Sequence, residues 1–74
     1  MNKERRNKIQ QVIDNINSVR EKLQEVLDDE QFAFDSMPEN LQYSMRGEES
    51  QEAIDYMNEV IEYLDNAIET LESI

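Results

Sequence analysis

The sequence predicts an all-α protein, an antiparallel hairpin of two long, coiled-coil-like helices with a short helix in the connector. Two observations predict this fold. Apolar residues recur at spacings of three and four along both halves of the 74-residue chain, as they do on one face of a helix. The only proline and the only glycine lie between these halves, in the stretch DSMPENLQYSMRGEES at residues 35–50. We therefore expect a single helical domain spanning residues 1–74, with helices at about 3–35 and 48–73 and a connector at about 36–47.

A first apolar stripe runs through the helix expected at 3–35. Its seam is predicted to consist of six residues: Ile9, Val12, Ile16, Val19, Leu23 and Val26. Ile13 and Leu27 are expected to widen this stripe. Asn2 precedes the helix and is a candidate N-cap, because its side chain can accept a hydrogen bond from a free N–H group of the first turn. Glu30 is the one ionisable residue at a predicted seam position, and we expect it at the exposed end of the core.

The second segment repeats more regularly and can be written as the heptads AIDYMNE, VIEYLDN and AIETLES. Its seam is predicted to consist of Ile54, Met57, Ile61, Leu64, Ile68 and Leu71. A further apolar row recurs every seven residues beside the seam: Ala53, Val60, Ala67 and Ile74. At 1.5 Å per residue, the two helices would each be roughly 40–45 Å long.

The charges at the two ends of the chain favour an antiparallel arrangement. It places the basic start beside the acidic finish, namely Lys3, Arg5, Arg6 and Lys8 beside Glu69 and Glu72. Each apolar stripe is three positions wide, which is more than one partner helix covers. We therefore expect a homodimer that forms a four-helix bundle. The alternative is that the connector folds back as a third helix and covers the stripes itself.

The connector is expected to contain a short helix over about Pro38–Met45. Ser36 and Glu39 have the spacing of a capping box, and the residue before a proline avoids the α region. Gly47 suits either a left-handed position at the end of this helix or the cap of the next one. Five residues are candidate partner contacts: Met37, Leu41, Tyr43, Met45 and Arg46. The alternative is that the two methionines and the leucine close the end of the core.

Acidic residues outnumber basic ones by 18 to 7, which gives a net charge of −11. Residues 1–34 carry six basic and seven acidic side chains, whereas residues 35–74 carry Arg46 alone against eleven acids. Such a field opposes direct binding of nucleic acids and anionic membranes and favours a protein partner with a basic surface. The alternative is that the charge only keeps the protein in solution. The candidate partner-binding acids are Asp55, Glu59, Glu62, Asp65, Glu69 and Glu72.

No catalytic, cofactor or metal motif is found, and we expect a protein that is not an enzyme. The carboxylates lack the Glu-x-x-His companion of a di-iron bundle, and the acidic run at 28–30 lacks the spacing and glycine of a calcium loop. The serines and threonine have no histidine or lysine base placed to activate them. The chain has no apolar run long enough to span a membrane, so a cytoplasmic location is expected.

Three stretches of the sequence resemble a known group of proteins. They are MNKERRNKI, DDEQFAFDSMPENLQ and RGEESQEAIDYMNEVIEYLDNAIETLE, and they resemble small acidic helical proteins of Gram-positive bacteria and their phages. The resemblance implies a helical protein in a phage or prophage setting and assigns no activity and no functional residue. Two functions remain open. The protein is either an inhibitor that mimics nucleic acid and binds a nucleic-acid-handling protein, or a structural component whose function is to form a homo-oligomeric bundle.

Overall fold

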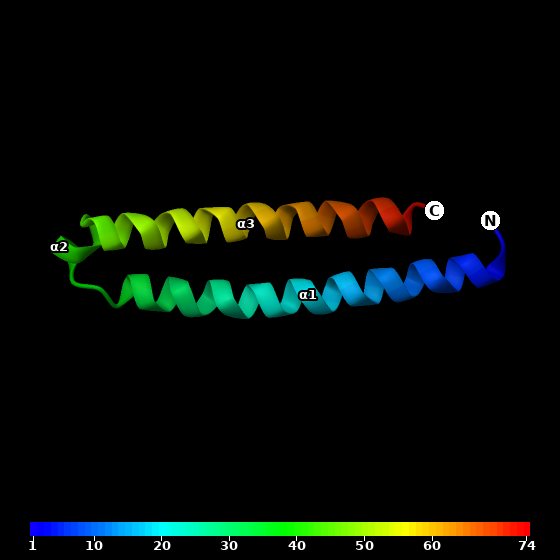
Figure 1. The fold of residues 1–74 in the computed structure, drawn as a ribbon, viewed down its shortest axis with the longest axis horizontal. Coiled ribbons are helices and arrows are strands. Elements are labelled where there is room, and N and C mark those ends of the chain that lie inside the picture. The colour runs from blue at the N-terminus through cyan, green and yellow to red at the C-terminus, as the bar shows by residue number, and fades with distance from the viewer.

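The computed structural model describes residues 1–74 as three helices, α1 (Lys3–Asp35), α2 (Glu39–Gln42) and α3 (Met45–Glu72). The helices α1 and α3 run antiparallel and side by side, and α2 lies at the closed end of the hairpin (Figure 1). The molecule is therefore extended, with dimensions of 58 × 15 × 12 Å. The predicted helical hairpin is confirmed. The alternative of a third helix that covers the apolar stripes is wrong, because α2 has only four residues and packs at the turn.

Polar side chains cap the first turns of both long helices. The Oδ1 of Asn2 accepts a hydrogen bond from the backbone N–H of Arg5 at 2.8 Å, which confirms the predicted cap of α1. At the start of α3, the Oγ of Ser44 accepts from the N–H of Gly47 at 3.4 Å. Because Ser44 provides this cap, α3 begins at Met45, about three residues earlier than expected, and the connector is correspondingly shorter.

Gly47 lies inside α3 and does not have a positive φ, so the left-handed and cap positions expected for it are both wrong. What requires a glycine here is close packing of the connector. A Cβ at this position would lie 2.2 Å from the carbonyl oxygen of Gln42. The expected capping box is also absent, because α2 begins after Pro38 and has no side-chain cap.

The core is a single seam between α1 and α3. On α3 the predicted seam is confirmed, and all six of its residues are buried or half-buried. On α1 the prediction is partly wrong, because Val12, Val19 and Val26 are 46%, 54% and 55% exposed. Ile13 and Leu27 are buried in their place. Compared with the predicted seam, α1 is rotated about its axis so that Ile13 and Leu27 face α3. Burying these two larger apolar side chains stabilises the fold more than burying valines would.

Two pairs of residues define how α1 and α3 are aligned. Ser50 donates a hydrogen bond to Glu30 at 2.6 Å, and Arg20 forms an ion pair with Asp65. The residue numbers of these pairs add up to 80 and 85, so residues whose numbers add up to about 80–85 lie near the same height along the hairpin. Glu30 is half-buried and hydrogen-bonded to the opposite helix, not at an exposed end of the core as expected.

Candidate interaction surfaces

The acidic residues of α3 lie on its outer surface. All six predicted partner-binding acids of this helix are exposed: Asp55, Glu59, Glu62, Asp65, Glu69 and Glu72. Of these, only Asp65 forms an ion pair, with Arg20 of α1. The helix carries nine acids in total, and the other three are also exposed: Glu48, Glu49 and Glu52. Eight of the nine carboxylates therefore face solvent without a basic partner.

Two acids of α3 have local partners that change pKa values. The hydrogen bond from Arg20 lowers the pKa of Asp65 below its ordinary value of 3.8. The hydroxyl of Tyr63 donates to Glu59 one turn away, and this bond together with the glutamate charge raises the pKa of the tyrosine above 10.0. The Asp65 carboxylate is thus stabilised in its charged form.

The charge density of α3 is close to that of one nucleic-acid strand. Its nine acids occupy residues 48–72, a length of about 36 Å at 1.5 Å per residue. This corresponds to one negative charge per about 4 Å of axis, compared with one per about 3.4 Å for a single strand of duplex DNA. A cationic surface that accommodates a phosphate backbone would therefore meet a similar linear charge density along this helix.

The predicted contact residues of the connector do not form one surface. Met37 is half-buried and Leu41 is 46% exposed, and both line a shallow pocket with Pro38 and Arg46. Met45 is 76% exposed at the first position of α3, so it does not close the core as one alternative proposed. Tyr43 is exposed as well. The spacing of Met37, Leu41 and Met45 predicted one face of a short helix, but α2 ends at Gln42 and Met45 belongs to α3.

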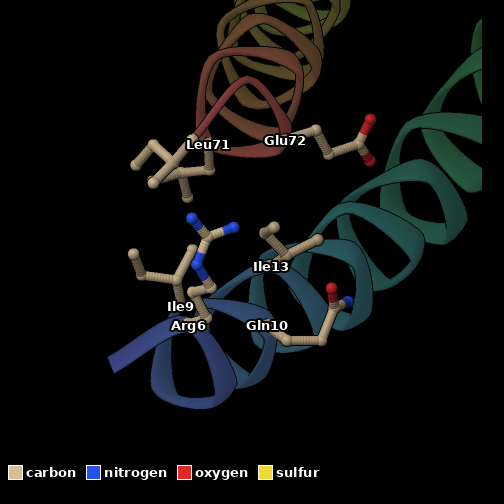
Figure 2. A pocket seen from close by; sticks show the side chains of 7 residues that line it. Arg6, Ile9, Gln10, Ile13, Leu71 and Glu72 are labelled. Carbon is tan, nitrogen blue, oxygen red and sulfur yellow. The ribbon is translucent and has the colours of Figure 1, made fainter. Parts of the chain in front are cut away.

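The open end of the hairpin holds a second shallow pocket (Figure 2). In this pocket the guanidinium of Arg6 lies between Ile9 and Ile13 and points toward Leu71, while Glu72 points away (Figure 2). The basic start and the acidic finish thus meet at this pocket, but they form no ion pair, and the only ion pair between the helices is Arg20–Asp65 near the middle. The physical reason is that α1 has 33 residues and α3 has 28, so the start of α1 extends past the end of α3 (Figure 1).

An exposed apolar surface, here called the valine face, is a feature that sequence reasoning placed correctly beside the seam on α3 but misplaced inside the seam on α1. It consists of two rows with heptad spacing, Val12, Val19, Val26 and Ala33 on α1 and Ala53, Val60, Ala67 and Ile74 on α3. All eight residues are exposed. The heptad repeat was the available signal, but it does not distinguish a row inside the seam from a row beside it.

Both rows of the valine face lie on the same side of the hairpin. Two antiparallel helices are related by an approximate two-fold axis perpendicular to their common plane, so equivalent rows project to the same side. Each row directly precedes a buried seam residue, as Val12 precedes Ile13 and Val60 precedes Ile61. The pocket near the connector agrees with this arrangement, because it is lined by both Ala33 and Arg46, the position seven residues before Ala53.

The opposite side of the hairpin is polar. Its two rows have the same heptad spacing and contain only amides and acids: Gln10, Asn17, Gln24 and Gln31 on α1, and Gln51, Asn58, Asp65 and Glu72 on α3. The hairpin therefore has one apolar face, one polar face and an acidic outer edge along α3.

Comparisons with known proteins returned no relatives: no protein-family model, no curated protein and no solved structure matches the chain. None of the helices has the length and apolar content needed to cross a membrane. No group of three or more histidine, cysteine, aspartate or glutamate side chains is arranged to hold a metal ion.

Proposed function

We propose that this protein is a non-enzymatic binding module whose α3 helix engages a basic surface of a nucleic-acid-handling protein. The observation that carries the proposal is the row of eight unpaired carboxylates on α3. Unpaired surface acids repel one another, and a cationic partner surface relieves this repulsion. The linear charge density of α3, close to that of one DNA strand, favours a partner that otherwise binds phosphate backbones.

The resemblance to acidic proteins of Gram-positive bacteria and their phages supports a cytoplasmic, phage-related setting for this activity. In that setting the protein would act as an inhibitor by occupying the nucleic-acid site of its target. The near-neutral α1 takes no part in this contact and instead supports α3, because its six basic and eight acidic residues give a net charge of only −2.

The second candidate is a structural protein that forms a homodimeric four-helix bundle. The valine face favours it, because three valines of α1 and one of α3 are 42–55% exposed in the single chain. A second copy would remove these side chains from water. The two candidates are compatible, because the valine face and the outer edge of α3 are different surfaces.

Affinity capture with a matched pair of charge variants tests the binding function. The variant Asp55→Asn/Glu59→Gln/Glu62→Gln removes three charges from the outer edge of α3. The control Asp14→Asn/Glu21→Gln/Glu25→Gln removes three charges from exposed positions of α1. Each protein is incubated with Gram-positive lysate at low and at high salt, and bound proteins are eluted with duplex DNA.

The proposal expects proteins that are captured at low salt, lost at high salt and displaced by duplex DNA. The α3 variant should capture much less of them, and the α1 control should capture them as the unmodified protein does. Equal capture by all three proteins would rule out the α3 surface. Equal loss in both variants would show a dependence on total charge and not on this helix.

A further inference from the structure

We propose that a second copy of the chain covers the valine face, with α1 of each copy packed on α3 of its partner and both connectors at the same end. This inference rests on the dimer proposed above and deepens it by naming the face and the pairing. It follows from three observations: the position of the valine face, the sizes of its side chains and the unequal charges of α1 and α3.

The valine face is large enough for a specific dimer. Its rows extend over about 31 Å at 1.5 Å per residue, and two helices side by side are about 20 Å wide. The projected area is thus about 600 Å² per copy, or about 1,200 Å² in the dimer, which is the lower limit for specific interfaces. Tyr56 and Tyr63 extend this area, because each lies three or four residues from Val60 and both are 60% exposed.

The side chains of the two rows differ in size in a way that suits this pairing. Residues at the same height have numbers that add up to about 80–85, so Val12 lies level with residues 68–73, Val19 with residues 61–66 and Val26 with residues 54–59. When α1 packs on the partner's α3, each of the three valines therefore faces a position between an alanine and a larger residue of the α3 row. Alternation of large and small residues across an interface allows the side chains to interdigitate.

The charges exclude the other symmetric pairing, in which α1 packs on α1 and α3 on α3. In that arrangement the α3 row of one copy, which contains Ala53 and Ala67, would lie against the α3 row of the other copy. Small residues allow the helices to approach closely. The same arrangement would bring together two helices that each carry nine acids and one base, a net charge of −8. Packing α1 on α3 instead places the acidic helices on a diagonal, where salt screens their repulsion more strongly.

A rim contact further supports packing of α1 on the partner's α3. Lys22 lies on the exposed side of the valine row of α1, and it has no ion pair within its own chain. By the same alignment, Lys22 lies level with residues 58–63 of the partner's α3, which include Glu59 and Glu62. This brings a basic residue of the nearly neutral helix to an acid of the other copy.

Single cysteines test the pairing directly, because the chain contains no cysteine. Val19→Cys and Val60→Cys are prepared separately, mixed while reduced and then oxidised. We expect a disulfide-linked dimer in the mixture at a rate well above that of either variant alone. Asn17→Cys and Asn58→Cys on the polar face provide the matched control, and they should not link alone or when mixed.

Sedimentation equilibrium from low to high micromolar concentration measures the dimer itself. Val60→Glu should weaken dimerisation about tenfold or more, because it places an unpaired charge in the interface. Asn58→Glu on the polar face should leave dimerisation unchanged. Circular dichroism of both variants shows whether the helices are retained.

Each contrary result has a distinct meaning. A monomer at all concentrations overturns both the dimer and this pairing. A dimer in which Val19→Cys links to itself faster than to Val60→Cys overturns the pairing alone and leaves the proposed dimer standing. A dimer that Val60→Glu does not weaken shows that another face is used. The capture experiment on α3 is a separate test, provided that sedimentation shows its Glu59→Gln and Glu62→Gln substitutions leave dimerisation intact.

Discussion

Arg20 of α1 donates hydrogen bonds to both carboxylate oxygens of Asp65 on α3. Such a bidentate pair fixes the orientation of both groups as well as attracting them. Arg20 occupies a position of the seam, between Ile16 and Leu23, and its side chain reaches the polar face where Asp65 lies. The pair therefore joins the two helices near their middle and fixes their alignment at a point where an apolar seam alone would permit sliding.

The Arg20–Asp65 pair predicts a loss of stability in acid. Arg20 lowers the pKa of folded Asp65, so the pair stabilises the fold above the unfolded pKa of about 3.9, and this contribution is lost as the pH falls through the lower folded value. The free energy of unfolding of the unmodified protein should exceed that of Asp65→Asn by a constant amount between about pH 5 and 8. The difference should shrink below about pH 4. Glu69→Gln, which removes an unpaired acid, should show no such pattern in chemical denaturation.

The hydrogen bond between Ser50 and Glu30 predicts a second effect on stability. Ser50 is buried, and its Oγ donates to the half-buried carboxylate at 2.6 Å. Ser50→Ala should cost about 1–3 kcal/mol, because the carboxylate loses its donor. Glu30→Leu/Ser50→Ala should recover this cost, since an apolar pair leaves no polar group unsatisfied. Ser18→Ala, at an exposed position of α1, should change stability by less than about 0.5 kcal/mol. An equal loss in the single and double variants would contradict this account.

Close packing at Gly47 predicts that alanine is harmful there despite its higher helix propensity. Alanine gains about 1 kcal/mol over glycine inside a helix. At Gly47, however, the added Cβ would lie 2.2 Å from the carbonyl oxygen of Gln42, and relieving that overlap requires the connector to move. We expect Gly47→Ala to lower the free energy of unfolding by about 1–3 kcal/mol. Asn66→Ala, at an exposed position of α3, should instead raise it by a few tenths, about 0.5 kcal/mol. If Gly47→Ala stabilised the protein as Asn66→Ala does, the connector would have moved away from the added Cβ at little cost in free energy.

Adjacent residues on α1 should respond differently to truncation. Leu27 is 7% exposed and Val26 is 55% exposed. Leu27→Ala should cost about 2–4 kcal/mol through lost burial and a cavity in the seam, and Val26→Ala less than about 1 kcal/mol. Thermal unfolding measures both, at a dilution where concentration no longer changes the transition. A larger loss of stability for Val26→Ala than for Leu27→Ala would show that Val26, and not Leu27, belongs to the buried seam.

Much of the fold follows from local sequence. The heptads of α3 specify its buried row, because residues such as Ile54, Ile61 and Ile68 lie on one side of a helix whatever it packs against. Asn2 as N-cap and the turn after Met37 also depend only on neighbouring residues. The acidic outer edge of α3 was predicted for the same reason, because the acids lie between the apolar positions.

The errors have a common cause, which is that they concern contacts between distant parts of the chain. The spacing of α1 permits two seams that differ by a small rotation, one with Val12, Val19 and Val26 and one with Ile13, Arg20 and Leu27. Local pattern favours the first because it contains no charge. The partner Asp65, 45 residues away, makes the second possible by accepting the hydrogen bonds of Arg20.

The sequence by itself determined that this protein is two long helices joined by a short turn, with an acidic second helix, because helical periodicity and charge are properties of single segments. Only the tertiary structure decided which face of α1 is buried, why Gly47 is needed and where the valine face lies. Each of these depends on how α1, α3 and the connector are aligned against one another. That alignment is decided by side-chain size and by two polar pairs, Arg20–Asp65 and Glu30–Ser50, which no local pattern reveals.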